Sequence, residues 1–166
     1  MAVKFSPAVA PLFVPATRPE RIAKAANSGA DAIIVDLEDA VAVADKDLAR
    51  AGLADYLADL PVPCFIRVNA VTSDWFYADM ELVRRVEGMG VMLPKSETAA
   101  DIEQIGPDIP VIALVETARG IVGLPDICQA QATCQLALPG TNSAYLSKLD
   151  TTSKALPALS FTTFLN

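Results

Sequence analysis

The stretch AIIVDLEDAV (residues 32–41) begins as an apolar strand and ends in a cluster of acids. Its first residues are all apolar, as expected of a strand that is buried on both faces. Asp36, Glu38 and Asp39 follow almost directly, although mutual repulsion and loss of solvation both oppose a carboxylate cluster at the end of an interior strand. The stretch therefore predicts a buried strand that leads either to a solvated loop or to a site for something cationic.

The composition indicates one folded domain. The chain has 166 residues, of which 52% are hydrophobic and 20% are charged, so a sizeable core is expected and disorder is not. The formal net charge is −7 and the sequence holds no long basic run, which disfavours nucleic acid or an anionic membrane as a partner. There is no histidine, so any chemistry must use carboxylates, lysine, arginine or an oxygen-bound cation such as Mg²⁺.

The sequence favours a cytoplasmic protein. The N-terminal segment is apolar but is interrupted by four prolines, so it is too short for a signal peptide or a membrane span. Three cysteines without a CxxC pair suggest reduced thiols.

Apolar runs alternate with amphipathic stretches from residue 11 onward, which predicts a parallel sheet covered by helices. Asp74 and Ser96 are the expected N-terminal residues of the third and fourth helices. A (β/α)8 barrel and an open doubly wound sheet both fit this alternation, and the lack of a GxGxxG or Walker A motif weakens a nucleotide-binding version. The strands are expected at residues 11–16, 31–39, 63–69, 91–95, 110–117 and 134–138, and the helices at residues 18–29, 45–60, 74–90, 96–106 and 118–130.

Polar side chains follow four consecutive strands. The acid cluster ends the second strand, Arg67 and Asn69 end the third, Lys95 ends the fourth and Glu116 ends the fifth. In parallel β/α folds the carboxyl ends of all strands lie on one rim, where ligands bind. The spacing therefore predicts one site built from these residues. Lys95 could line this site or pair with an acid of the cluster, and we favour the pairing.

Four segments carry a resemblance to a known family: LFVPATRPERIAKAANSGADAIIVDLEDAV, IRVNA, VMLPKSETAADI and ALVETARGI. In their order and spacing they resemble the citrate lyase beta subunit-like proteins of the HpcH/HpaI aldolase superfamily. The resemblance implies a TIM-barrel α/β fold, a Mg²⁺ cofactor, and cleavage or formation of carbon–carbon bonds in 3-hydroxy acids carried as acyl-CoA or acyl-carrier thioesters. The absence of histidine places the chain nearer the citrate-lyase side than the pyruvate-aldolase side.

The resemblance also implies roles for single residues. Glu116 is implied as a metal ligand that also contacts the substrate, and Arg67 as the residue that grips the substrate carboxylate. Glu38 and Asp39 are implied as the catalytic acids, acting through metal-bound water or on the substrate hydroxyl. Arg18 follows the first strand and is expected either to meet a CoA phosphate or to be an ordinary surface charge.

The chain departs from the family pattern near its end. We treat residues 1–166 as a single domain that is family-like over residues 11–137 and has a divergent tail at residues 138–166. The expected second metal carboxylate falls on Asn142 or Ser143, and the loss of this charge predicts weak Mg²⁺ binding. The tail resembles a family sequence that has been cut, so about six strand–helix units of an incomplete barrel are expected.

Three hypotheses about function stay open. The first is a Mg²⁺-dependent carbon–carbon lyase that acts on a citryl, malyl or citramalyl type of thioester. The second is a truncated, catalytically inactive remnant of such an enzyme. The third is a non-catalytic binding or assembly subunit on the same fold. The expected partners are a small acyl thioester or a hydroxy dicarboxylic acid and further copies of this chain, since an incomplete barrel exposes sheet edges and apolar faces.

Overall fold

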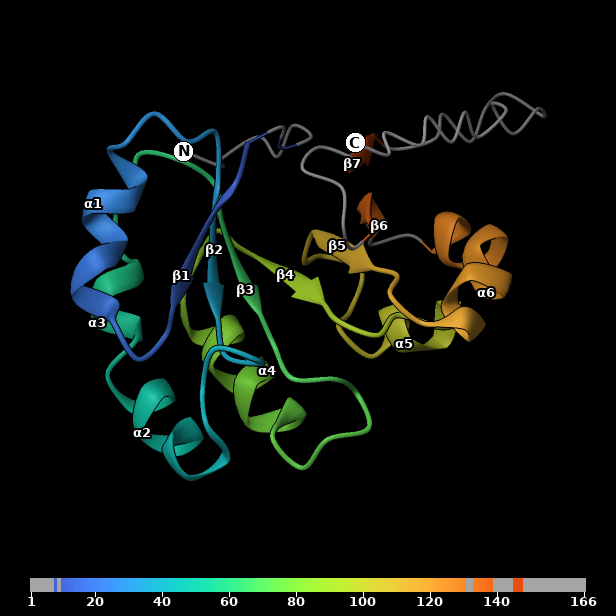
Figure 1. Ribbon diagram of the computed structural model, residues 1–166, viewed down its shortest axis with the longest axis horizontal. Coiled ribbons are helices and arrows are strands. Elements are labelled where there is room, and N and C mark those ends of the chain that lie inside the picture. The colour runs from blue at the N-terminus through green and yellow to red at the C-terminus, as the bar shows by residue number, and fades with distance from the viewer. Residues whose placement is uncertain (1–7, 9, 131–132, 139–144, 148–166) are drawn as a thin grey trace, which may run out of the picture.

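Six apolar runs of the sequence form six parallel strands, as predicted. The computed structural model describes residues 8, 10–130, 133–138 and 145–147. In its sheet, each strand pairs with the strand that precedes it in the chain (Figure 1). The parallel strands are β1 (Leu12–Pro15), β2 (Ile33–Asp36), β3 (Cys64–Arg67), β4 (Met89–Leu93), β5 (Val111–Leu114) and β6 (Thr133–Ala137).

A seventh strand departs from the predicted pattern. Strand β7 (Tyr145–Ser147) pairs with β6 in the antiparallel direction. Only residues 138–144 connect the two strands, and a parallel crossover needs a dozen or more residues. Within the described residues, β1 and β7 are the two ends of the sheet order, so this part of the chain is an open α/β sheet of barrel type.

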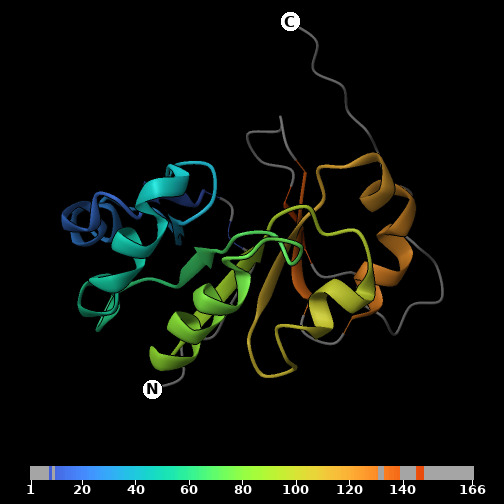
Figure 2. The ribbon, with the colours of Figure 1, turned by 90° about the horizontal axis from the view of Figure 1, so that it is seen from below.

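Helices follow each of the first five strands, and those near β1 and β2 lie at the opposite end of the sheet from α5 and α6 (Figures 1 and 2). None of the helices in the described ranges is both long and apolar enough to cross a membrane. The helical segments are η1 (Pro19–Arg21), α1 (Ile22–Ala26), η2 (Val43–Asp45), α2 (Lys46–Ala51), α3 (Ala54–Leu57), α4 (Phe76–Arg85), α5 (Ala99–Glu103) and α6 (Ala118–Gln129).

Three details of the helix predictions were wrong. The helix expected over residues 45–60 is interrupted after α2 at Gly52, a residue that weakens helices. Asp74 does not cap α4, whose N-cap residue is Trp75. Ser96 does not cap α5, because its buried hydroxyl donates to the Leu93 carbonyl, and a capping box between Thr98 and Asp101 begins the helix instead.

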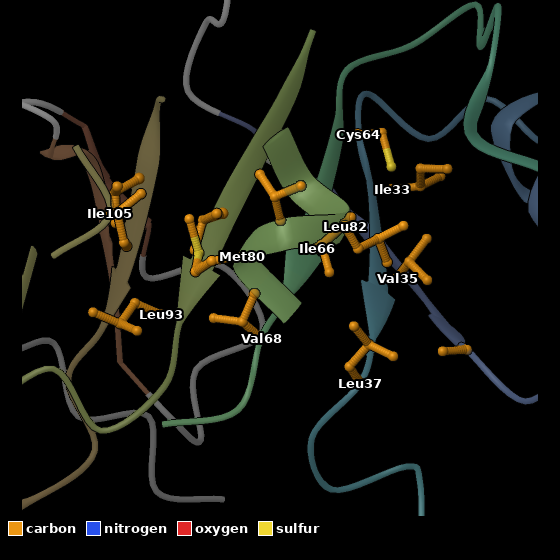
Figure 3. Packing of buried hydrophobic residues seen from close by; sticks show 14 of the residues in the cluster. Ile33, Val35, Leu37, Cys64, Ile66, Val68, Met80, Leu82, Leu93 and Ile105 are labelled. Carbon is orange, nitrogen blue, oxygen red and sulfur yellow. The ribbon is translucent and has the colours of Figure 1, made fainter. Parts of the chain in front are cut away.

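The two faces of the sheet carry separate apolar clusters, because successive side chains of a strand point to opposite faces. On β2, Ile33 and Val35 pack against the helices, whereas Ile34 belongs to the cluster on the other face. Figure 3 shows side chains from β2 and β3 grouped with Met80 and Leu82 of α4. Asp36 follows Ile34 by two residues, so its side chain leaves the strand on the same face, away from the helices. The same alternation predicts that face for Arg67, two residues after Phe65.

Helix α6 approaches the loop between β4 and α5 closely, and two glycines permit this contact. A Cβ atom on Gly120 would collide with the Ser96 carbonyl oxygen, and one on Gly123 would collide with the Glu97 carbonyl oxygen. Thr117 adds a hydrogen bond of 2.8 Å from its hydroxyl to Glu97. The position of this loop, which includes the end of the fourth predicted strand, therefore depends on α6.

We expect Gly123→Ala to lower the free energy of unfolding by about 2 kcal/mol, because the new methyl group cannot be accommodated without moving backbone atoms. Gly52→Ala is the matched control, since no atom lies within 4 Å of its added Cβ and it should change stability by less than about 0.5 kcal/mol. Urea unfolding of both variants measures the difference. Equal stability of the two variants would contradict the close packing of α6.

Candidate functional site

The ends of β2 and β3 are joined by a buried ion pair. The strand register places Asp36 directly beside Arg67. The Arg67 Nε atom donates to Asp36 Oδ1 at 2.8 Å, and Nη2 donates to Oδ2 at 2.5 Å. Asp36 also accepts hydrogen bonds from the backbone N–H groups of Glu38 and Ala40, at 2.8 and 3.2 Å. Both carboxylate oxygens of Asp36 thus accept hydrogen bonds within the protein. One edge of the Arg67 guanidinium is bound to Asp36.

Glu38 is buried but is less completely bound. Its side chain is 8% exposed, and Oε1 accepts a hydrogen bond of 2.5 Å from the ammonium of Lys95. Its Oε2 lies 3.5 Å from Arg67 Nη1 and has no hydrogen-bond partner among the described residues. Burial raises the pKa of Glu38 above the usual value, against the opposing effects of Lys95 and Arg67. Glu38 is therefore an acid with a free, buried acceptor oxygen.

Lys95 connects Glu38 to Glu116. The backbone N–H of Lys95 donates to Glu116 Oε1 at 3.1 Å while its ammonium binds Glu38. Its backbone has a φ of 50°, a conformation that is uncommon for residues other than glycine. Because Lys95 contacts both carboxylates, the acids that follow β2 and β5 are bridged by a single residue. The predicted pairing of Lys95 with the acid cluster is confirmed.

Asp39 and Phe13 lie at the outer side of this group. The Asp39 side chain is 73% exposed, and its Oδ2 is 3.6 Å from Arg67 Nη1. The ring of Phe13 on β1 lies 5.3 Å from the guanidinium carbon of Arg67, within the range of a cation–π contact. Arg67 is thus held between an aromatic ring and three carboxylates, and its Nη1 atom faces the two acids that make the longer contacts.

A buried polar network supports the backbone of the acid cluster, and the sequence analysis missed it. The ammonium of Lys46 donates to the carbonyl oxygens of Leu37 and Glu38, at 2.8 and 2.9 Å. Asn69, which was predicted for the rim, donates to the Leu37 carbonyl and to Asp79, a fully buried acid. In the sequence Lys46 and Asp79 resemble ordinary charged residues on helix surfaces, so no local signal distinguishes them.

Among the described residues, the predicted Arg18 is not joined to this group. The Arg18 side chain is 52% exposed and forms an ion pair with Glu20 at 2.8 Å. Asn142 and Ser143 lie outside the described residues. Within the described ranges, no three His, Cys, Asp or Glu side chains are grouped so as to hold a metal ion. A CoA contact for Arg18 and a metal-ligand role for Ser143 therefore stay predictions.

A parallel α/β sheet that gathers acids and an arginine at the carboxyl ends of its strands has the arrangement of a small-molecule site. The model of the HpcH/HpaI aldolase/citrate lyase family matches residues 10–154. The chain therefore belongs to this family, as the sequence resemblance predicted.

Two relatives agree with this assignment. A citrate lyase subunit beta-like protein of Mycobacterium tuberculosis strain H37Rv is 47% identical over 122 residues, which are 74% of this chain and 44% of the relative. A (3S)-malyl-CoA thioesterase of Cereibacter sphaeroides strain ATCC 17029 is 35% identical over 133 residues, covering 76% of this chain and 47% of the relative. The chain thus spans less than half the length of these two proteins.

Two solved structures of the M. tuberculosis protein are similar to this fold. The structure described as citrate lyase beta subunit with oxaloacetate and magnesium has a TM-score of 0.69 at 43% identity and covers 79% of this chain and 58% of its own. The structure of CitE with magnesium, acetoacetate and coenzyme A has the same TM-score at 40% identity, with coverage of 80% and 49%. The TM-scores indicate that both structures share the arrangement of the sheet described above.

The two buried acids should respond differently to neutralisation. Asp36→Asn should lower the free energy of unfolding by about 3 kcal/mol, because it leaves one edge of the buried Arg67 facing an amide N–H donor. Glu38→Gln removes a charge that burial disfavours and keeps the side-chain volume, so it should change stability by less than about 1 kcal/mol. Guanidinium unfolding of both variants in metal-free buffer provides the measurement, and a larger loss for Glu38→Gln would reverse the roles assigned to the two acids.

The wild type and Glu38→Gln should also differ in how their stability depends on pH. Because the folded-state pKa of Glu38 is raised, the folded protein binds that proton more tightly than the unfolded chain does. The stability of the wild type should therefore increase relative to Glu38→Gln as the pH falls through the raised pKa towards 4.5, the ordinary value. Unfolding curves of the two proteins between these values check the sign, and a widening gap in favour of the variant would contradict it.

Proposed function

We propose that this chain carries the Mg²⁺-dependent acyl-thioester site of a carbon–carbon lyase of the citrate lyase beta-like class. The observation that supports this proposal most directly is the linkage of Glu38, Arg67 and Glu116 through the contacts of Lys95 and Arg67 at one end of the sheet. The family includes proteins named for citrate lyase and for malyl-CoA hydrolysis, so the general part of the proposal is an enzyme that acts on acyl thioesters. Cleavage of a carbon–carbon bond is the finer proposal.

The described donors fit magnesium. Mg²⁺ takes oxygen ligands and commonly uses only one or two protein carboxylates, completing its shell with water and substrate oxygens. Glu116 would supply one carboxylate, and Glu38, which Lys95 links to Glu116, would add a second negative charge. The two solved structures of the M. tuberculosis protein described above contain magnesium. The ion, when bound, supplies Lewis-acid stabilisation of the enolate that carbon–carbon cleavage produces.

Two further functions, substrate binding and proton transfer, are assigned to side chains of the site. The Nη1 atom of Arg67 is the part of the guanidinium that Asp36 leaves free, and it can donate to a substrate carboxylate. Cleavage requires a base to take the proton of the 3-hydroxyl group, and no histidine is present to do so. Glu38 fits this task, because burial raises its pKa and its Oε2 atom has no hydrogen-bond partner within the described residues.

Two further statements belong to this proposal. The substrate is a small hydroxyacyl thioester or hydroxy dicarboxylic acid, in keeping with the oxaloacetate and coenzyme A named in the solved relatives. The cytoplasm as location and homo-oligomers as the assembled form stay predictions from the sequence. The exposed Leu12 and Phe13 on the terminal strand β1 are compatible with self-association.

Metal binding tests the site directly. Titration calorimetry of the full chain with MgCl₂ should show weak binding, and Glu116→Gln should reduce the affinity at least about tenfold, because a neutral amide is a poorer ligand. Glu103→Gln makes the same charge change at an exposed position of α5 and should leave the affinity unaltered. Tight binding that persists in Glu116→Gln would overturn the assignment of this ligand.

Restoring a carboxylate tests the predicted second ligand. We expect either Asn142→Asp or Ser143→Asp, but not both, to strengthen Mg²⁺ binding about tenfold in the same titration, because a second charged oxygen would complete the protein's share of the site. If neither variant differs from the wild type, the family position of the second carboxylate does not fall on this segment.

The products of (3S)-malyl-CoA distinguish the candidate reactions. A lyase transfers the hydroxyl proton to a base, breaks the bond between C2 and C3, and returns a proton to C2 of the enolate that results, so glyoxylate and acetyl-CoA are released and no free thiol appears. A thioesterase adds water to the thioester and releases malate and free CoA. We expect Mg²⁺-dependent formation of acetyl-CoA and glyoxylate, abolished in Glu38→Gln, as measured by chromatography. Mg²⁺ binding without turnover would favour the non-catalytic alternative instead.

A further inference from the structure

Lys95 holds an unusual position among the residues of the proposed site. It contacts two carboxylates from separate strands, with its ammonium on Glu38 and its backbone N–H on Glu116. Strand order places β3 and β4 between the strands that these acids follow. The ammonium is therefore a positive charge within the acid group, bound to one oxygen of the carboxylate whose other oxygen lacks a hydrogen bond within the described residues.

The local backbone favours this arrangement. The φ of 50° at Lys95 belongs to the left-handed region, and the buried hydroxyl of the next residue, Ser96, closes the turn on the Leu93 carbonyl. Helix α6 then packs Gly120 against the carbonyl of Ser96. These contacts fix the base of the lysine side chain, whereas the side chain itself is 52% exposed and has room to move. Lys95 can thus keep its N–H on Glu116 while its ammonium leaves Glu38.

An ammonium ion and a divalent cation cannot both lie close to the same carboxylates without repulsion. Two positive charges within a few ångströms repel each other, and burial strengthens the repulsion because less solvent screens them. A cation held by Glu116 and attracted by Glu38 would lie close to the Lys95 ammonium, because Lys95 donates its backbone N–H to Glu116 and its ammonium to Glu38. The two cations are therefore alternatives at Glu38.

We propose that Lys95 is a built-in counter-cation of this site: its ammonium neutralises Glu38 and is displaced when a divalent cation binds, so that Lys95 lowers the metal affinity that the carboxylates alone would give. This inference rests on the proposed metal site and adds a positioning residue to it. The backbone N–H of Lys95 continues to orient Glu116 in both arrangements. The affinity for Mg²⁺ is then set by a lysine as well as by the number of acids.

Removing the ammonium provides the test. In calorimetric titrations of the full chain with MgCl₂ at constant pH, Lys95→Met should bind about tenfold more tightly than the wild type, because the competing charge is absent. Lys95→Arg keeps the charge and should stay within about threefold of the wild type. Lys24→Met makes the same change in net charge at an exposed residue of α1 and should not alter the affinity. A purely structural role of Lys95 predicts no gain in affinity.

A second variant covers the case in which Lys95→Met fails to fold. Lys95→Gly retains the N–H donor and tolerates the positive φ, so it should fold and show the same tighter binding. Wild-type affinity or weaker binding in the folded variants would overturn the role of Lys95, while loss of binding in Glu116→Gln would still support the metal site. If neither the wild type nor any Lys95 variant binds Mg²⁺, the proposed function itself fails, and the inference with it.

Discussion

The ion pair between Asp36 and Arg67 joins the ends of β2 and β3, and the rest of the acid group is arranged around it. Asp36 is buried and Arg67 is partly buried, and the Arg67 guanidinium is the cation that compensates the Asp36 charge. Asp36 takes two of the guanidinium N–H groups and leaves Nη1 directed to Glu38 and Asp39. The sheet register alone puts the two residues side by side. Asp36 therefore stabilises the fold, and the acids that follow it are available for chemistry.

Buried polar side chains that do not line the site hold the loop that bears Glu38. Lys46 binds the carbonyl oxygens of Leu37 and Glu38, and Asn69 binds Leu37 again, so the backbone at this point has few alternative positions. Asp79 orients Asn69 and also pairs with Arg50 at 2.8 Å. A preorganised carboxylate requires this kind of support, because a side chain on an unsupported loop would lose its geometry through small backbone movements.

The sequence was sufficient for the strands and for their common rim, because each strand is apolar along its length and parallel strands end on one side. It was not sufficient for the pairing among the rim residues. The contact of Lys95 with Glu38 depends on a left-handed residue and on the close approach of α6, which are products of tertiary packing. The break at Gly52 and the antiparallel direction of β7, in contrast, have local causes, a glycine within a helix and a short connection, which the sequence analysis did not use. Residue types at the site could thus be predicted, but not which acid each cation binds.

The balance of charge explains why a divalent cation suits this rim. Within the described residues, the acids Asp36, Glu38, Asp39 and Glu116 outnumber Arg67 and Lys95, their cationic partners, by two. Behind the loop, Arg50 pairs with Asp47 and Asp79, while the Lys46 ammonium also interacts with Asp36, Glu38 and Asp39 and offsets part of this excess. If a divalent cation replaces the ammonium at Glu38, the lysine moves toward solvent, where its charge is screened and its hydration is restored. The ion then relieves the repulsion among the acids other than Asp36, so this part of the cluster opposes folding slightly and favours binding, as expected where residues are gathered for function.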